Sequence, residues 1–478
     1  MTTPIGRTEE IAVLSKILNS EEAELLAVYG RRRVGKTFLI RNVYQKQIIF
    51  EFSGIHNATL QQQLESFTET LTKATSSLPL ARPVSWVQAL NMLREGMTPL
   101  LKKGKRVIFF DEVPWIHSKR SGFLNAFENF WNTWASGQKN LVVVICGSAA
   151  SWMIQKVINN KGGLYNRVTR RIRLMPFNLN ETELFLRKRG IKLDRYQILQ
   201  LYMALGGIPH YLKEIEKGES AAQAIDRICF TKDGLLFNEF KSLYQSLFDN
   251  ARYHMEVIRA LAGKNSGLMR NEIIDKCHLT SGGGATQILE ELTESGFITP
   301  NIPFDRKVKD SLYRLTDEYS RFYIKFMENS RASGAGTWLK LSSGSSWKSW
   351  SGYAFESICM KHTQLLKKAL GIEKVYSEQS VWRCQPTDDN PGVQIDLLID
   401  RRDQCINICE MKFSENDFEI TKSYAKELAD KLKVFKAHTK TRKTLFLTMV
   451  TTYGVKNVKN HAGLIENEIT MDALFSAL

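Results

Sequence analysis

The sequence predicts an α/β protein with a largely parallel sheet near its start, a helical region in the middle and a second α/β region at its end. Three observations carry this prediction. Up to about residue 180, short apolar runs such as LLAVYG, VIFFDE and LVVVICGS alternate with amphipathic segments, which is typical of buried parallel strands flanked by helices. From residue 181 to about 250, apolar residues recur at helical spacing. From residue 352 onward, helical and strand-like segments alternate again.

Composition bounds the class of protein. The 478 residues leave room for about three domains, and 43% hydrophobic and 10% aromatic residues are ordinary for a globular chain. The first residues, MTTPIGRTEEI, lack the basic start and apolar core of a signal peptide, and no apolar run approaches the roughly 18 residues that span a bilayer. Seven scattered cysteines show no CxxC spacing for zinc. We expect a soluble, cytoplasmic protein with reduced thiols and no membrane contact.

The charge balance indicates a polyanionic partner. Sixty-six basic and 50 acidic residues give a net charge of +16. Residues 151–215 contain 12 basic and 4 acidic residues, whereas residues 340–478 contain 20 and 17. Half of the surplus therefore lies in one short stretch, centred on VTRRIRL and LRKRGIK. A nucleic acid is the expected partner, with DNA favoured over RNA.

A phosphate-binding loop follows the first predicted strand. Residues 30–37, GRRRVGKT, match the spacing G-x-x-x-x-G-K-[ST], with the strand LLAVY before them and a helix after them. Two glycines let the backbone amides face phosphates at a helix N-terminus, the lysine reaches the β and γ phosphates, and the threonine ligates Mg²⁺. We expect ATP and Mg²⁺ as cofactors. Nucleotide contacts are expected from Gly30, Arg31, Arg32, Arg33, Val34, Gly35, Lys36, Thr37 and Phe38.

Two further strand ends complete the expected nucleotide site. Asp111 and Glu112 end the run VIFFDE, where the aspartate would hold Mg²⁺ and the glutamate would polarise the attacking water. Solvated carboxylates at a strand end are the structural alternative. Ser148 follows LVVVICGS, and its hydroxyl suits sensing of the γ phosphate or capping of a helix.

Together with GRTEEI, DEVPW, GSAASWM, LYNRVTRRIRLMPF and GGIPHYL, these motifs resemble the AAA+ ATPases, specifically the archaeal and bacterial branch with a nuclease-like C-terminal domain. The resemblance spans most of the chain. It implies that Arg7 lies beside the adenine and that Ser148 is the first sensor.

The same resemblance implies an arginine finger. Arg167 in LYNR is the leading candidate, and Arg170 and Arg171 compete for the role; Asn166 departs from the glycine that family members often have there. Because such a finger often comes from a neighbouring subunit, we expect a homo-oligomer. Alternatively, the cluster contacts nucleic-acid phosphate, and the two uses can coexist.

Residues 252–329 follow the order helix, helix, helix, hairpin, as in winged-helix domains. Residues 253–330 contain 10 basic and 11 acidic residues, and Glu290, Glu291 and Glu294 crowd the third helix. A surface that follows DNA phosphates is basic, so we favour a packing or protein-contact role over DNA reading.

Residues 331–351 are rich in serine and glycine and suggest a linker or hinge. Trp338, Trp347 and Trp350 argue against simple disorder. We expect these side chains to dock the linker onto a neighbouring domain and to couple the two halves of the protein.

The last region carries a second group of charged residues. Glu356 lies on a predicted helix, Asp396 closes the strand VQID, and Glu410 and Lys412 occupy alternate positions of CINICEMKF. Residues two apart on a strand face the same side, so two carboxylates and a lysine can converge on Mg²⁺. The alternative is a surface carboxylate pair with a lysine salt bridge.

The order E…D…ExK resembles the PD-(D/E)xK restriction-endonuclease-like superfamily. The resemblance implies that Asp396, Glu410 and Lys412 are catalytic and that Glu356 is an extra metal ligand, with Tyr424 a weaker candidate. Metal ligands are thus expected in two places: Thr37 and Asp111 at the nucleotide, and Glu356, Asp396 and Glu410 here.

The fold expected from these resemblances is a P-loop AAA+ sheet (1–180), a helical lid subdomain (181–250), a winged-helix domain (251–330), a linker (331–351) and a restriction-endonuclease-like α/β domain (352–478). The expected function is an ATP-hydrolysing, DNA-acting protein whose ATPase regulates a metal-dependent nuclease, in defence, repair or mobile-element biology. The alternatives are a nucleotide-dependent switch or scaffold with a non-cleaving domain, and a helicase-like remodeller. An intact triad does not demonstrate cleavage.

Overall fold

The computed structural model describes residues 4–76, 80–102, 104–117, 121–158, 166–280, 282–330, 334–386, 392–461 and 463–477. The chain divides into two compact units, which we treat separately. The first comprises residues 1–176, 245–249 and 290–296, and the second comprises residues 177–244, 250–289 and 297–478. Over the described ranges, no helix combines the length and apolar character needed to cross a membrane. The finer domain boundaries given above stay a prediction.

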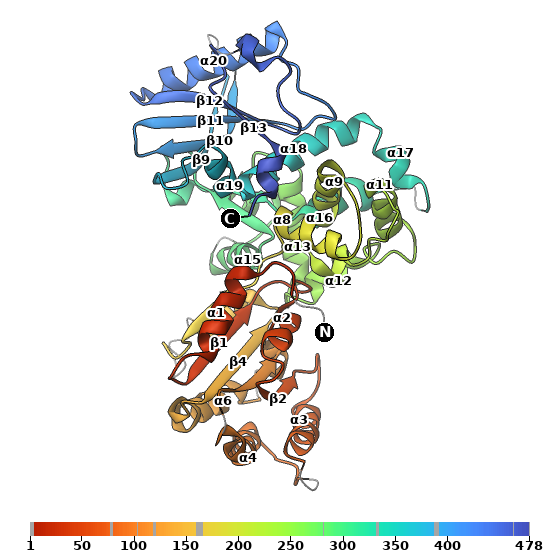
Figure 1. The fold of residues 1–478 in the computed structure, drawn as a ribbon, viewed down its shortest axis with the longest axis vertical. Coiled ribbons are helices and arrows are strands. Elements are labelled where there is room, and N and C mark those ends of the chain that lie inside the picture. The colour runs from red at the N-terminus through yellow and green to blue at the C-terminus, as the bar shows by residue number, and fades with distance from the viewer. Residues whose placement is uncertain are drawn as a thin grey trace. The chain divides into compact units, whose positions relative to one another are not determined.

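A parallel five-stranded sheet forms the centre of the first unit. Its order is β2-β3-β4-β1-β5, and every neighbouring pair is parallel (Figure 1). The predicted strands in LLAVYG, VIFFDE and LVVVICGS are confirmed as β1, β3 and β4. The strands are β1 (Glu24–Tyr29), β2 (Ile48–Ser53), β3 (Arg106–Asp111), β4 (Leu141–Gly147) and β5 (Arg170–Arg173).

Helices cover both faces of this sheet. Alternate residues of β1 and β3, such as Leu25 and Ile108, pack with α3, α4 and α6. Helices α1 and α2, whose buried residues include Leu14 and Leu39, lie on the opposite side of the sheet (Figure 1). The result is a three-layer α/β/α unit. The helices are α1 (Thr8–Leu18), α2 (Lys36–Val43), α3 (Leu60–Thr75), α4 (Trp86–Met97), α5 (Val113–Ile116), α6 (Phe123–Thr133) and α7 (Ala150–Trp152).

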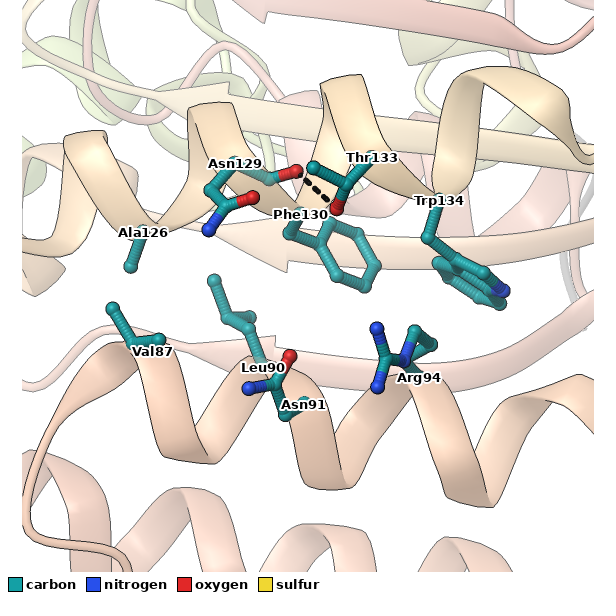
Figure 2. A pocket seen from close by; sticks show the side chains of 9 residues that line it. All are labelled: Val87, Leu90, Asn91, Arg94, Ala126, Asn129, Phe130, Thr133 and Trp134. Carbon is teal, nitrogen blue, oxygen red and sulfur yellow. Dashed lines mark hydrogen bonds between the residues drawn. The ribbon is translucent and has the colours of Figure 1, made fainter.

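A small gap separates α4 from α6. Figure 2 shows Leu90 and Arg94 of α4 facing Ala126, Phe130 and Trp134 across it. Its volume of about 10 Å³ holds at most a single water molecule. We therefore regard it as a packing feature rather than a binding site.

Helices dominate the start of the second unit, as the sequence predicted from residue 181. Asn178 and Asp194 cap α8 and α9 by accepting from backbone amides of the first turn. The α-helices that lie wholly or mainly in this unit up to residue 322 are α8 (Leu179–Lys188), α9 (Arg195–Leu205), α10 (Pro209–Leu212), α11 (Ala221–Ile225), α12 (Glu239–Gln245), α13 (Ala251–Ala262), α14 (Arg270–Lys276), α15 (Gly283–Glu294) and α16 (Glu318–Phe322).

A small antiparallel sheet accompanies α13, α14 and α15. Its order is β6-β8-β7, with β6 (Leu268–Met269), β7 (Ile298–Asn301) and β8 (Leu312–Leu315). The predicted helices and the trailing hairpin are confirmed as secondary structure. Their assignment as a winged-helix domain stays a prediction.

The segment expected to be a linker is helical over much of its described length. It contains α17 (Thr337–Leu341) and the start of α18 (Ser345–Lys361). Trp338 is 1% exposed, and its ring lies 4.9 Å from that of Phe322, 5.2 Å from that of Phe326 and 5.9 Å from that of Phe230, between centroids. Burial of the tryptophans in this aromatic cluster outweighs the weak helical propensity of a serine- and glycine-rich sequence.

The second unit ends in a mixed five-stranded sheet of order β13-β12-β11-β10-β9, in which β9-β10 and β10-β11 are antiparallel and β11-β12 and β12-β13 are parallel. Helix α20 packs its Leu428 and Phe435 against one face of it (Figure 1). The predicted strands and helix are confirmed, whereas β9 and β13 were not expected. The elements are α19 (Thr363–Ala369), β9 (Ser377–Cys384), β10 (Val393–Arg401), β11 (Cys405–Lys412), α20 (Lys422–Thr439), β12 (Thr444–Thr451) and β13 (Asn467–Thr470).

Candidate functional site

The loop between β1 and α2 has the backbone shape that its glycines predict. Gly30 and Gly35 have φ of 146° and 93°, and Arg33 is also left-handed, with φ of 71°. A Cβ on Gly30 would lie 2.3 Å from the carbonyl oxygen of Leu174, which no real side chain tolerates. The loop therefore requires glycine at this position, both for its dihedral angle and for the close approach of another backbone.

The side chain of Lys36 turns back toward the backbone of the phosphate-binding loop. It is only 5% exposed, and its Nζ donates to the carbonyl oxygens of Gly30 and Arg31 and to Ser148 Oγ, each at 3.0 Å. The ammonium group is thus held at the carboxyl ends of β1 and β4, which is where ligands bind in open α/β sheets.

Thr37 and the acidic strand end meet directly. The hydroxyl of Thr37 donates to Asp111 Oδ2 at 2.7 Å, and Asp111 Oδ1 accepts from the backbone amide of Glu112 at 3.0 Å. Asp111 is buried at the end of β3. A hydroxyl beside an ionisable carboxylate is a donor set that suits Mg²⁺, so these residues fit the expected ion.

Glu112 faces Ser148. The backbone of Glu112 is left-handed, with φ of 47°, and its two carboxylate oxygens accept from the amide of Ser148 at 3.1 Å and from the Ser148 hydroxyl. Ser148 Oγ therefore bridges Lys36 and Glu112. The structure brings together five of the predicted residues, Lys36, Thr37, Asp111, Glu112 and Ser148, and their individual roles stay predictions.

The remaining predicted nucleotide contacts surround this centre. Arg7 is buried, with Nη2 3.3 Å from the carbonyl oxygen of Val34 and Nη1 3.5 Å from Glu10. The guanidinium of Arg32 lies over the Trp115 ring at 5.9 Å. Arg31 and Val34 are buried and Arg33 is half-buried, whereas Phe38 is 49% exposed on α2.

The three arginine-finger candidates are all exposed. Arg167 precedes β5, and Arg170 and Arg171 lie on β5 beside Leu26 and Ala27 of β1. Arg173 differs from them, because its Nη2 donates to the carbonyl oxygens of Thr293 and Glu294 at 2.8 and 2.7 Å.

The second candidate site lies in the last sheet. Leu397 pairs with Cys409 across the antiparallel strands β10 and β11, which puts Asp396 and Glu410 at the next opposed position. Lys412 Nζ lies 3.0 Å from Glu410 Oε1, so the predicted same-side placement of these two residues is confirmed. Gln394 donates to Asp396 Oδ1 at 2.6 Å.

Glu410 is buried among donors. The hydroxyl of Tyr424 donates to Oε1 at 2.7 Å, and Lys431 Nζ donates to Oε2 at 2.8 Å. Burial acts to raise the pKa of Glu410, but Lys431 and Lys412 outweigh it and hold the pKa below its ordinary value. Glu410 is therefore an ionised carboxylate whose negative charge is balanced by lysines of its own chain.

Glu356 on α18 differs from it in protonation. Its Oε2 is buried and lacks a hydrogen-bond partner in the described chain. Burial, followed by the negative charge of Asp396, raises the pKa of Glu356 to about 8, against a lowering by Arg314. Glu356 is thus a protonated acid near neutral pH.

Carboxylates are the ligands that Mg²⁺ prefers, and the buried unpaired oxygen of Glu356 would fit an ion that displaces the proton of this acid. Nevertheless, within the residues that the structure describes, no three His, Cys, Asp or Glu side chains form a group ready to hold a metal ion. Lysine contacts take up both oxygens of Glu410.

Lys431 is the residue that sequence reasoning missed. A signal was present: Tyr424, Leu428, Lys431 and Phe435 recur at helical spacing on α20, so a lysine interrupts an otherwise buried face. Lysine on such a face usually has a carboxylate partner.

The geometry of the first site and the sheet that carries it define a P-loop ATPase. Residues 5–215 match a family described as an ATPase domain predominantly from Archaea. We therefore identify this part of the chain as an archaeal-type ATPase domain.

Individual relatives were also found. The uncharacterized protein MJECL04 of Methanocaldococcus jannaschii is 23% identical over 428 residues, which cover 88% of this chain and 90% of that protein. The uncharacterized ATP-binding protein MJ0423 of the same organism is 42% identical over 45 residues, 9% of this chain and 76% of that protein. Among solved structures, the Walker-type ATPase paby2304 of Pyrococcus abyssi is 18% identical with a TM-score of 0.46, covering 67% of this chain and 96% of its own.

Proposed function

We propose that this protein is an ATP-hydrolysing AAA+ switch that acts on DNA and whose ATPase domain regulates a metal-dependent nuclease domain at residues 352–478. The observation that carries the proposal is the chain of contacts from Lys36 through Ser148 to Glu112, with Thr37 and Asp111 beside it. These groups would connect the phosphate-binding lysine to the position of the Glu112 carboxylate.

At the nucleotide, Thr37 and Asp111 would hold Mg²⁺, which neutralises phosphate charge when bound. Lys36 leaves the carbonyl oxygens of Gly30 and Arg31 for the phosphates. That movement would leave the Ser148 hydroxyl and amide holding the Glu112 carboxylate, which would then orient the attacking water.

The ATPase test compares the wild type with Lys36→Ala, Glu112→Gln and the exposed-lysine control Lys46→Ala. Lys36→Ala is expected to weaken ATP binding, Glu112→Gln to bind ATP but hydrolyse it about 100-fold more slowly, and the control to match the wild type. Normal hydrolysis by both site variants would refute the assignment of this site.

DNA binding is proposed from the concentration of positive charge. Arg167, Arg170 and Arg171 are exposed and belong to the 151–215 stretch that contains 12 basic and 4 acidic residues. Neutralised phosphates make affinity fall with salt in proportion to their number. Replacing all three by glutamine should therefore weaken duplex binding and flatten its salt dependence; an unchanged slope would exclude these arginines from the interface.

A homo-oligomer is proposed because an exposed Arg167 suits donation to the active site of a neighbouring subunit. Mixing Arg167→Ala with Lys36→Ala subunits tests this directly. We expect the mixture to recover ATP hydrolysis. If the two variants stay inactive when mixed, the arginine finger is not supplied by another subunit.

The nuclease assignment is supported by Asp396, Glu410 and Lys412 on adjacent strands and by Glu356 on α18. These carboxylates would hold the metal ion, and Lys412 would stabilise charge on the phosphate. The test is cleavage of single-stranded and duplex DNA with Mg²⁺ or Mn²⁺, with and without ATP, by the wild type, Glu410→Ala and the control Glu427→Ala. Glu427 is an exposed residue of α20. Cleavage that persists in Glu410→Ala would refute the assignment.

The engagement of Glu410 by two lysines favours a second candidate, a nucleotide-dependent switch or scaffold whose C-terminal domain binds nucleic acid or protein without cleaving. Its signature is slow ATP hydrolysis with no DNA cleavage under any of the conditions above.

A further inference from the structure

Glu410 is engaged on both carboxylate oxygens by groups of its own chain. Tyr424 and Lys412 reach Oε1, and Lys431 reaches Oε2. Glu410 is 7% exposed and Lys431 is 9% exposed, so this ion pair is largely buried. Lys412 is more open, with a side chain 32% exposed.

The position of Lys431 is set by the core. Leu428 and Phe435, one turn before and one turn after it on α20, are fully buried against the sheet. They fix the rotation of the helix, and the lysine between them points at the carboxylate on β11. Lys436, on the same helix, is exposed and forms no ion pair within the described residues.

We propose that Lys431 is a built-in counter-cation of Glu410 that controls whether a divalent cation binds at this site. The proposal rests on the proposed function in taking Asp396, Glu410 and Glu356 as the ligands. A buried carboxylate needs a cationic partner, and Lys431 supplies one. An ammonium group and a divalent ion compete for the same oxygen and repel each other at such short range.

Two consequences follow. A divalent ion binds Glu410 only when Lys431 withdraws from Oε2, so the wild type binds the ion weakly. Removing the charge at residue 431 therefore strengthens binding, by at least about tenfold given the size of a charge–charge interaction near a protein surface.

The test measures Mn²⁺ binding to the full chain without nucleotide, by the electron paramagnetic resonance signal of the free ion. Lys431→Met keeps the length and apolar stem of the side chain and removes its charge. Lys436→Met is the matched control. Lys431→Met is expected to bind Mn²⁺ at least about tenfold more tightly than the wild type, the control to equal the wild type, and the double variant Lys431→Met, Glu410→Ala to lose the gain.

Equal or weaker Mn²⁺ binding by folded Lys431→Met overturns the proposal, as does a gain that survives Glu410→Ala. The variant retains Lys412 and Tyr424 as partners of Glu410, and circular dichroism checks its fold. Lys431→Gln replaces it if it fails to fold, with the same expected direction.

A measurement on the wild type needs no substitution. Acylation of Lys431, read by peptide mass spectrometry, should increase when Mn²⁺ is added, because the amine is displaced; no increase at saturating Mn²⁺ overturns the proposal. DNA cleavage is scored separately. If the protein never cleaves DNA but shows these Mn²⁺ effects, the proposed role of Lys431 as counter-cation stands and the proposed nuclease function is refuted.

Discussion

Ser148 contacts two of the functional residues predicted for the ATPase domain. Its hydroxyl touches Lys36 on one side and Glu112 on the other, and its backbone amide also donates to Glu112. Lys36 begins α2, and Glu112 and Ser148 directly follow β3 and β4 at the same edge of the sheet. Ser148 therefore connects the phosphate-binding lysine with the proposed water-orienting carboxylate.

We predict that Ser148→Ala lowers kcat for ATP hydrolysis by about tenfold or more and changes the affinity for ATP little, since it removes the hydroxyl that positions Glu112. Steady-state hydrolysis and equilibrium ATP binding measure the two effects. Ser53→Ala, at the exposed end of β2, is the control. A large loss of ATP affinity with normal kcat would contradict this positioning role.

The raised pKa of Glu356 predicts how the stability of the protein depends on pH. Its folded pKa is raised to about 8, so between its ordinary unfolded value of 4.5 and pH 8 the folded state holds a proton that the unfolded state releases. The stability that this proton provides is full below pH 4.5 and is lost as pH rises toward 8.

We predict that the free energy of unfolding of the wild type falls by on the order of 2–4 kcal/mol between pH 5 and pH 8. Glu356→Gln should not show this fall, because glutamine mimics the protonated acid. Urea unfolding at the two pH values measures it. An equal decline in the wild type and the variant would show that Glu356 is not the titrating group.

At the scale of elements, α17 is held in place by a distant carboxylate. Asp226 Oδ2 accepts from the amide of Gly336 at 2.7 Å and Oδ1 accepts from the amide of Trp338 at 2.6 Å. These are orphan donors of the first helical turn, so a residue 110 positions earlier does the work that a neighbouring cap usually does. The cap also places Trp338 in its aromatic cluster.

We predict that Asp226→Ala destabilises the second unit by about 1–2 kcal/mol and partly exposes Trp338, since it leaves two amides without acceptors. Urea unfolding and tryptophan emission measure the two effects. Asp233→Ala, at an exposed loop position nearby in sequence, should change neither. Equal stability of the two variants would mean that solvent replaces the cap at no cost.

At the scale of the whole molecule, the two compact units contain different candidate sites. The P-loop site lies in the first unit and the Glu410 cluster in the second. A ligand that binds only the folded state stabilises the unit that binds it, by about 2.7 kcal/mol at a concentration 100 times its Kd.

We predict two calorimetric transitions, of which a non-hydrolysable ATP analogue with Mg²⁺ raises one by about 5–10 °C. Lys36→Ala should abolish that shift, and Asp226→Ala should lower the other transition only. A single transition that both changes affect would show that the units unfold together.

The sequence by itself determined the features that depend on neighbouring residues, namely the P-loop and the individual strands and helices. The P-loop is eight consecutive residues, and its glycines, lysine and threonine need only the strand before them and the helix after them. Asp111, Glu112 and Ser148 were also predicted, because parallel strands end at a common edge and each residue follows an apolar run. The strands and helix of the last region were readable for the same reason, since their periodicity is local.

Only the tertiary structure decided which distant groups meet. Lys431 and Glu410 are 21 residues apart, and their contact depends on how α20 lies on the sheet. Residues 331–351 have the composition of a linker, yet burial of Trp338, Trp347 and Trp350 outweighs that local preference and gives helices. Propensity and spacing act over a few residues, whereas burial and charge pairing act between whichever residues packing brings together, and this is why the partner of Glu410 could not be identified from the sequence.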